Sequence, residues 1–291
     1  MMKRKVIQLA GKTLVVSLPS KWARQQNITK GQEVEVTCDI NGLHITPDSR
    51  PQWKKHTLDV RPHDDATIKS ALSVLHKAGA DEIEVFYHPE QQKTIHERVR
   101  TNLMGFEVVQ QSPQRMLIQN VTGDADQSFD ALMRRVFLVT LELATGVEHA
   151  LHTQTSAAEF LSLEETNNKL TNYCHRLLIK KQAEHSIFTY TILWLQEKIA
   201  DDYKTIIHLM ENKQSSHSAQ KSATHLTSAL RAYYEAVYSP DLSTISRARK
   251  HIESIDISVK DDITAAFCSV KQHLLDGIGS LTALALSQAP A

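Results

Sequence analysis

Two hydrophobic periodicities divide this chain into a front part and a rear part. Up to about residue 121, apolar residues alternate with polar ones or form short β-branched runs between turn residues, a pattern typical of strands with interspersed helices. From Asp124 onward the apolar residues recur at helical spacing. We therefore predict a multidomain α+β protein whose rear part is entirely helical.

Residues 1–50 are predicted to form a small unit of strands with one short helix. The runs KVIQLA and TLVVSL flank Gly11 as two strands, and Pro19 is expected at the first position of a helix over PSKWARQQN. In EVEVTCDINGLHIT the alternation continues, and Asn41-Gly42 supplies the positive φ angles of a tight hairpin turn. About fifty residues bury too little apolar surface to offset the entropy of ordering them. We expect two chains to intertwine here as a homodimer.

A second domain is predicted over residues 56–122, after a linker at SRPQWKKH. The order of strands and helices is βαβαββ, which implies a small α/β layer. The expected elements are a strand His56–Val60, a helix Asp65–Ala78, a strand Asp81–Tyr87, a helix Pro89–Leu103, and a hairpin of FEVVQQ and RMLIQNV through Ser112-Pro113.

The third domain, residues 124–291, is predicted to consist of helices joined by short connections. Ser/Thr/Asn clusters, the stretch NKQSSHS and Ser239-Pro240 mark the breaks between them. Such a pattern favours two three-helix bundles side by side. The expected helices are 124–153, 157–183, 187–212, 218–238, 242–255 and 257–287.

The charges of the chain sum to zero but are unevenly distributed. The first 32 residues hold seven lysines and arginines and no acid, which leaves 26 basic against 33 acidic residues in the remainder. A basic front end on an acidic body suggests a polyanionic partner such as duplex DNA. A solvated basic surface is the alternative. The predicted DNA contacts are Lys3, Arg4, Lys5, Lys12, Lys21 and Arg24.

Few patterns point to catalysis. Gly11-Lys12-Thr13 ends like a phosphate-binding loop, but Val6 replaces the required first glycine and a strand follows in place of a helix. No Gly-x-Ser-x-Gly motif occurs, and the three cysteines lie far apart, as in a protein of the reducing cytosol. No apolar run reaches the roughly 18 residues that a membrane span requires. We therefore predict a cytoplasmic protein that is not an enzyme and does not insert into a membrane.

Three carboxylates on the helix over 187–212 are candidates for specific roles. Glu197 and Asp201 stand four residues apart, opposite an apolar stripe, and could chelate a metal if a neighbouring helix adds ligands. A solvated helix face is the alternative. Asp202 falls near the edge of the apolar stripe, where it could pair with a base on another helix.

The first 47 or so residues resemble the AbrB/MazE/SpoVT family of swapped-hairpin DNA-binding domains. The likeness lies in a basic strand, a glycine, the strand end VSLP, a Lys-Trp helix and KGQEVEV, all in register. The resemblance implies a β-barrel of which each chain supplies half, with basic residues of the strands and loops docked on DNA.

The helical part resembles PhoU, the phosphate-uptake regulator, through DALMRRVFLVTLELATGV and LQEKIADDYKTI. The whole layout resembles archaeal-type PhoU proteins with an AbrB-like head. The resemblance implies Glu-x-x-x-Asp clusters that bind a divalent or ferric metal, here Glu197 with Asp201, helped by Glu164 and Asp276. Asn168 and Gln272 stand where further acids are expected, so the cluster is eroded.

These patterns together predict a DNA-binding transcriptional regulator of phosphate uptake whose helical body contacts a phosphate transporter or sensor component. One rival is an adaptor that modulates such a component without binding DNA. Another is an antitoxin-like repressor whose body holds a toxin. A metal-dependent hydrolase is the third.

Overall fold

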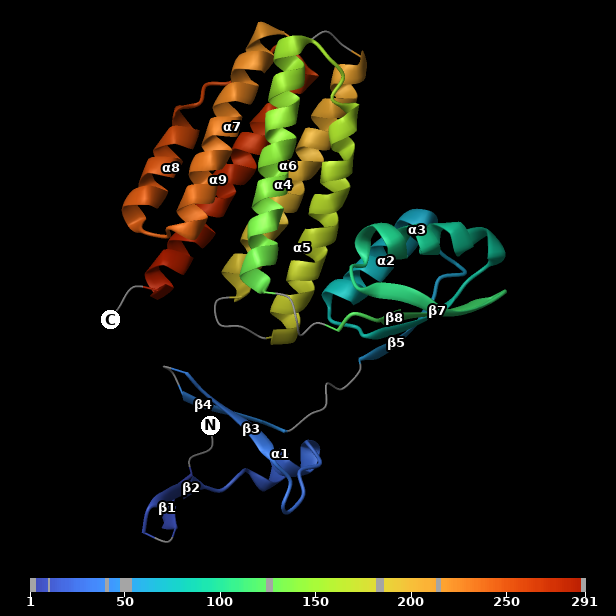
Figure 1. The fold of residues 1–291 in the computed structure, drawn as a ribbon, viewed down its shortest axis with the longest axis vertical. Helices are drawn as coiled ribbons and strands as arrows, with labels where there is room; N and C mark the ends of the chain where they lie inside the picture. The colour runs from blue at the N-terminus through green and yellow to red at the C-terminus, as the bar shows by residue number, and fades with distance from the viewer. Residues whose placement is uncertain are drawn as a thin grey trace. The chain divides into compact units, whose positions relative to one another are not determined.

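The computed structural model describes residues 4–9, 11–39, 42–47, 54–123, 128–181, 186–212 and 216–288 (Figure 1). Contacts between residues divide the chain into two compact units, Met1–Trp53 and Lys54–Ala291, here called the head and the body. The body contains both the predicted α/β layer and the predicted helices.

The described residues of the head form two antiparallel hairpins and one short helix. Val6 pairs with Val16 in the first hairpin and Val34 with Pro47 in the second. Gly42 was predicted to occupy a central position of the tight turn in the second hairpin. It pairs instead with Asp39 and begins a strand. Asn41, the other predicted turn residue, lies outside the described residues. The elements are β1 (Val6–Leu9), β2 (Thr13–Val16), α1 (Ser20–Gln25), β3 (Val34–Asp39) and β4 (Gly42–Pro47).

The α/β layer of the body is a four-stranded sheet with two helices on one face (Figure 1). The strand order is β5-β6-β8-β7, with β5 parallel to β6 and the other neighbours antiparallel. Ile83 and Val85 alternate with half-buried glutamates along β6, so one face packs on the helices and the other meets solvent. The elements are β5 (Lys55–Asp59), α2 (Asp65–Lys77), β6 (Glu82–Phe86), α3 (Gln92–Asn102), β7 (Phe106–Ser112) and β8 (Arg115–Asn120).

The described residues of the helical part form six α-helices, as the periodicity predicts. The first and last begin about one turn later than predicted because side-chain caps fix their starts: Ser128 accepts from the Ala131 N–H and Asp261 from the Thr264 N–H. The helices are α4 (Phe129–Thr153), α5 (Leu161–Lys181), α6 (Ser186–Asn212), α7 (His217–Tyr238), α8 (Leu242–Ser254) and α9 (Asp262–Gln288).

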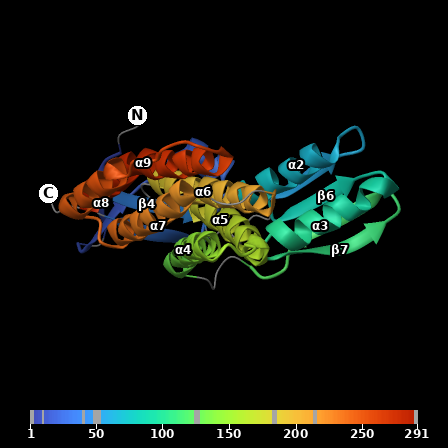
Figure 2. The same cartoon turned by 90° about the horizontal axis from the view of Figure 1, so that it is seen from above.

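The two predicted three-helix sets share one hydrophobic core. The most extensive contact between any two elements joins α6 of the first set to α9 of the second, and α4 also packs on α7. Figure 2 shows α6 between α9 and α5. Phe137, Tyr203, Tyr233 and Phe267 lie fully buried in this continuous cluster. In the described part of the chain, no helix combines the length and the apolar character that crossing a membrane requires.

Candidate nucleic-acid interface

The tip of the first hairpin is shaped by a glycine. Gly11 has a φ of +78°, in the left-handed region where a side chain is disfavoured. The Lys12 N–H donates to the Leu9 carbonyl at 3.4 Å, and the Gln8 side-chain amide donates to the Gly11 carbonyl at 2.9 Å. This turn holds Lys12 at an exposed position between β1 and β2.

Local signals also define both ends of α1. Pro19 is the N-cap in an extended conformation, so the helix begins one residue later than predicted. At the other end Asn27 adopts a φ of 54°, and the Ile28 N–H donates to the Ala23 carbonyl at 2.8 Å. This arrangement is a Schellman motif. Its left-handed position is occupied by Asn27, and Asn adopts that backbone conformation more readily than most residues. The helix is therefore short and its limits are set by its own sequence.

The predicted DNA-contacting cations of the head are exposed. Lys21 and Arg24 stand three apart on α1 and share a face, and the Arg24 Nε donates only to the Ser20 carbonyl, at 3.3 Å. No salt bridge in the described part of the chain engages any of these cations. The exposed cations are Arg4, Lys5, Lys12, Lys21 and Arg24; Lys3 lies outside the described residues.

The described residues of the head form no core of their own within one chain. Among the head residues whose exposure is described, none is buried. Large apolar side chains on β1 and β2 are 43% to 71% exposed. A unit with this much exposed apolar surface requires a partner surface to be stable in water. The apolar side chains concerned are Val6, Ile7, Leu9, Leu14 and Val16.

Residues 7–53 match the family described as antidote-toxin recognition MazE, bacterial antitoxin. The head is thus a MazE-type domain, as its turn, proline and helix predict, and this type of domain suggests DNA binding or dimerisation. The match ends at Trp53, so the likeness of the helices to PhoU stays a prediction. Comparison with curated proteins and with solved structures gives no match.

Among the described residues of the body, the predicted carboxylates do not form a group of metal ligands. Glu164 is 2% exposed and accepts hydrogen bonds from Asn168 at 2.6 Å and from Lys204 at 3.2 Å. Burial raises the pKa of Glu164 above its ordinary value, against the opposing effect of Lys204. This carboxylate is held by an amide and an ammonium group, which occupy the place of further acidic ligands.

Two of the other predicted ligands also have a lysine or an amide as their hydrogen-bond partner. Asp201 accepts from Lys198 at 2.7 Å, and Asp276 accepts from Gln272 at 2.8 Å. Glu197 keeps one buried oxygen without a hydrogen-bond partner among the described residues. No three His, Cys, Asp or Glu side chains come together as metal ligands in the described ranges. The prediction of a shared metal site is therefore not supported, because lysines and amides stand where its other acids would be.

One predicted pairing in this region is confirmed. Asp202 lies 2.9 Å from the Nδ1 atom of His273, which projects from α9. Burial raises the pKa of Asp202, and His273 opposes that rise. The pair links the two helices that share the largest interface.

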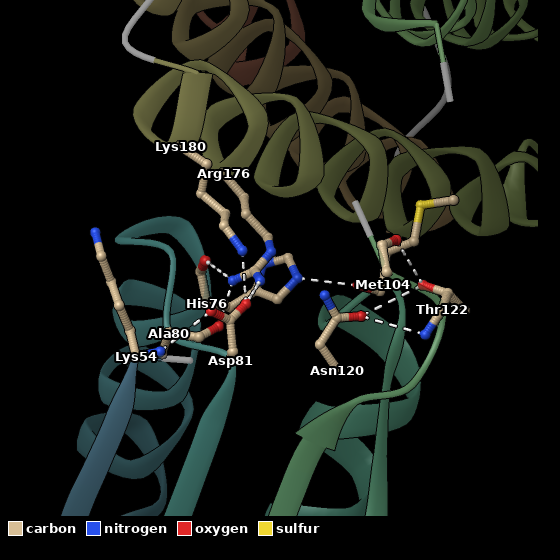
Figure 3. Close-up of polar contacts among 10 residues, drawn as sticks. Lys54, His76, Ala80, Asp81, Met104, Asn120, Thr122, Arg176 and Lys180 are labelled. Atoms are coloured by element: carbon tan, nitrogen blue, oxygen red, sulfur yellow. Dashed lines mark hydrogen bonds and ion pairs between the residues drawn. The ribbon is translucent and has the colours of Figure 1, made fainter. Parts of the chain in front are cut away.

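A buried polar site that was not predicted from the sequence lies around Arg176 (Figure 3). Arg176 of α5 is fully buried and donates to the carbonyls of His76, at 3.2 Å, and of Ala80. Its other terminal nitrogen lies 2.5 Å from the Asp81 carboxylate, which also accepts from Lys180 at 2.7 Å. The guanidinium group therefore joins the helices to the C-terminal end of α2, where helix carbonyls lack partners within the helix.

Aromatic and charged groups complete this Arg176 junction. The guanidinium lies 5.0 Å from the centre of the Phe106 ring, and the His76 ring meets the same phenyl edge-on. Burial raises the pKa of Asp81, but the Lys180 and Lys54 hydrogen bonds and the Arg176 charge outweigh it, so this pKa lies below its ordinary value. Asp81 therefore remains ionised at neutral pH, as the ion pair requires.

Proposed function

We propose that this protein is a dimeric DNA-binding regulator whose MazE-type head docks on duplex DNA. The observation that supports this best is the combination of exposed cations, which form no salt bridge among the described residues, with the exposed apolar side chains of β1 and β2. A second copy covers that surface, and dimerisation doubles the number of cations and fixes their spacing, which suits a palindromic site. The role of the body is to bind a partner; contact with phosphate-uptake components, which the PhoU resemblance implies, is the finer form of this proposal.

DNA binding is tested by changing the charges of the head. Replacing Arg4, Lys12 and Arg24 together by Ala should weaken binding to a duplex and flatten the plot of log affinity against log salt. Each lost phosphate contact should reduce that slope by about 0.9, because each contact releases counterions. Fluorescence anisotropy with a labelled duplex over a range of salt concentrations measures both quantities.

The matched control removes three exposed cations from the body, at Arg135, Lys221 and Lys250. This variant should keep the salt dependence of the original protein. If the wild-type protein shows no salt dependence, or if the body variant loses as much affinity as the head variant, the proposed interface is wrong.

Dimerisation through the head is tested at one apolar position. Leu14 is 71% exposed in a single chain, and Leu14→Asp should raise the dimer dissociation constant at least about tenfold, since burying a leucine contributes about 1.5–3 kcal/mol. Leu286→Asp is the control, because Leu286 is similarly exposed at 59% but lies on α9. Sedimentation equilibrium compares the variants. Equal dissociation constants for the two variants would place the dimer contact elsewhere.

An antitoxin-like role is the second candidate, and the description of the matched family favours it. In that case a small open reading frame beside the gene should arrest growth when expressed alone. Co-expression of this protein should restore growth. Restoration by the Arg4/Lys12/Arg24 variant as well would separate toxin binding from DNA binding.

A further inference from the structure

A cavity of about 820 Å³ opens in the body between α3, β7 and α5. Its size falls within the range of about 300–1,000 Å³ that is common for small-molecule sites. It draws residues from both the α/β layer and the helices, and ligand sites often occupy such boundaries. We call it the α3 groove.

The floor of the α3 groove is apolar. Val99, Leu103 and Phe106 line it and also belong to the core of the α/β layer, where they are 5%, 1% and 3% exposed, so each offers only a small part of its surface. Val108 of β7 also lines the groove and is half-buried. Gly105 makes the turn from α3 to β7 with a φ of +84°. The exposed part of Val108 and the edges of the core side chains therefore form the apolar part of the groove.

Lysine and arginine side chains stand on the rim of the groove. Lys93 and Arg100 lie on one side of α3, and Lys169 of α5 lies close enough to donate to the Arg100 carbonyl at 3.3 Å. His96 lies between them on α3, with its Nε2 atom 2.8 Å from the Gln111 side-chain oxygen. Within the described chain no salt bridge engages Lys93, Arg100 or Lys169. These cations are thus available to an anion.

Two carboxylates also line the groove, but they leave the positive charge in excess. Glu97 turns toward Lys69, whose ammonium lies 3.5 Å from its carboxylate. Glu107 is exposed on β7. The groove therefore has three cations, Lys93, Arg100 and Lys169. Glu107 is its one carboxylate that forms no salt bridge among the described residues.

We propose that the α3 groove binds a small organic anion, with a carboxylate, phosphate or sulfonate group on an apolar body. The apolar body would cover Val108 and the exposed edges of Val99 and Phe106, and the anionic group would contact Arg100 and Lys169. A fully polar anion would make no use of this apolar part of the groove, and a neutral apolar molecule would leave the cations without an anionic partner. Such a ligand contacts both the layer and the helices, and its binding does not depend on the proposed DNA-binding role.

Anilinonaphthalene sulfonate is a suitable probe, because it joins an aromatic body to one anionic group. Fluorescence titration should show that Arg100→Gln/Lys169→Gln weakens its binding about tenfold or more, as expected for the loss of two charged contacts. The control variant, Lys221→Gln/Lys250→Gln, removes two exposed lysines elsewhere in the body and should bind as the wild type does. N-phenylnaphthylamine lacks the sulfonate, so its affinity should change little in either variant.

A second measurement locates the bound probe. Acetylation of lysines, followed by mass spectrometry, should show that the sulfonate probe protects Lys93 and Lys169 while Lys221 and Lys250 react as before. In the Arg100→Gln variant the probe should no longer protect these lysines from acetylation. This result supports the site if circular dichroism shows that the variant keeps the wild-type fold. Unchanged reactivity of Lys93 and Lys169, or equal weakening in the control variant, overturns it, because the probe then binds another apolar surface.

Discussion

Replacing Asp81 by Asn is expected to lower the free energy of unfolding of the body by about 3–5 kcal/mol, the usual cost of removing one partner from a buried ion pair. Arg176 is fully buried, so its positive charge would lose its carboxylate without gaining access to water. The backbone carbonyls of His76 and Ala80 would still accept from it but cannot neutralise it. Urea denaturation followed by circular dichroism measures the change.

Asp59→Asn is the matched control for this prediction. Asp59 also pairs with an arginine, Arg61, but both side chains are largely exposed, so the substitution should have little effect. A double-mutant cycle of Asp81→Asn with Arg176→Gln should give a coupling energy of about 1 kcal/mol or more, since the two groups are in contact. Equal, small effects of Asp81→Asn and Asp59→Asn would show that the Arg176 junction does not stabilise the body.

The pH dependence of the Asp81 contribution follows from the direction of its pKa shift. The pKa of Asp81 is lower in the folded protein than in the unfolded chain, where it is about 3.9. Its stabilising effect is therefore complete above that value and is lost as the pH falls through the lower, folded pKa. Above about pH 5 this carboxylate should contribute a constant amount.

Acidification from pH 7 to pH 4 should remove up to about 3 kcal/mol of stability through His175 alone. Burial lowers the pKa of His175 from 6.5 to about 4. Its Nε2 atom lies 3.2 Å from the Tyr190 carbonyl, while Nδ1 is buried without a hydrogen-bond partner among the described residues. The folded protein thus favours the neutral ring with the proton on Nε2.

The sign of this effect is set by which state binds the proton. Between about pH 6.5 and pH 4 the unfolded chain protonates His175 and the folded protein does not, so stability falls as the pH falls. Urea unfolding at a series of pH values should give a shallower decline for His175→Gln than for the wild type. His152→Gln, at an exposed position on α4, should leave the decline unchanged. If His175→Gln retains the wild-type slope, another group controls the acid sensitivity.

Local features of the fold were predictable because their causes lie within a few residues. Asp64 caps α2 through the Thr67 N–H, so the helix starts at Asp65 as predicted. Alternation placed Ile83 and Val85 on the buried face of β6. The errors are small and also local: Pro19 is the N-cap of α1 and not its first residue, and Gly42 begins a strand.

The chemistry of the body was less predictable, because it depends on which helices become neighbours. Glu164 and Lys204 are 40 residues apart in the chain, and their pairing removes a predicted metal ligand. The α3 groove likewise depends on Lys169 of α5 reaching the carbonyl of Arg100 on α3. Periodicity shows that a residue is buried or exposed but does not show what lies opposite it.

The sequence by itself determined the strands, the helices and the basic character of the head, because each follows from spacing or composition, and the small size of the head predicts that it needs a second chain. The tertiary structure alone decided that the two helix sets share one core and that Arg176 and Asp81, 95 residues apart, form a buried pair. It also decided which groups lie beside the acids of the body, such as Lys204 and Asn168 beside Glu164 and Lys198 beside Asp201. Such pairings are fixed only when distant elements pack together, since electrostatic and hydrogen-bond contacts act over a few ångströms in space and not along the chain.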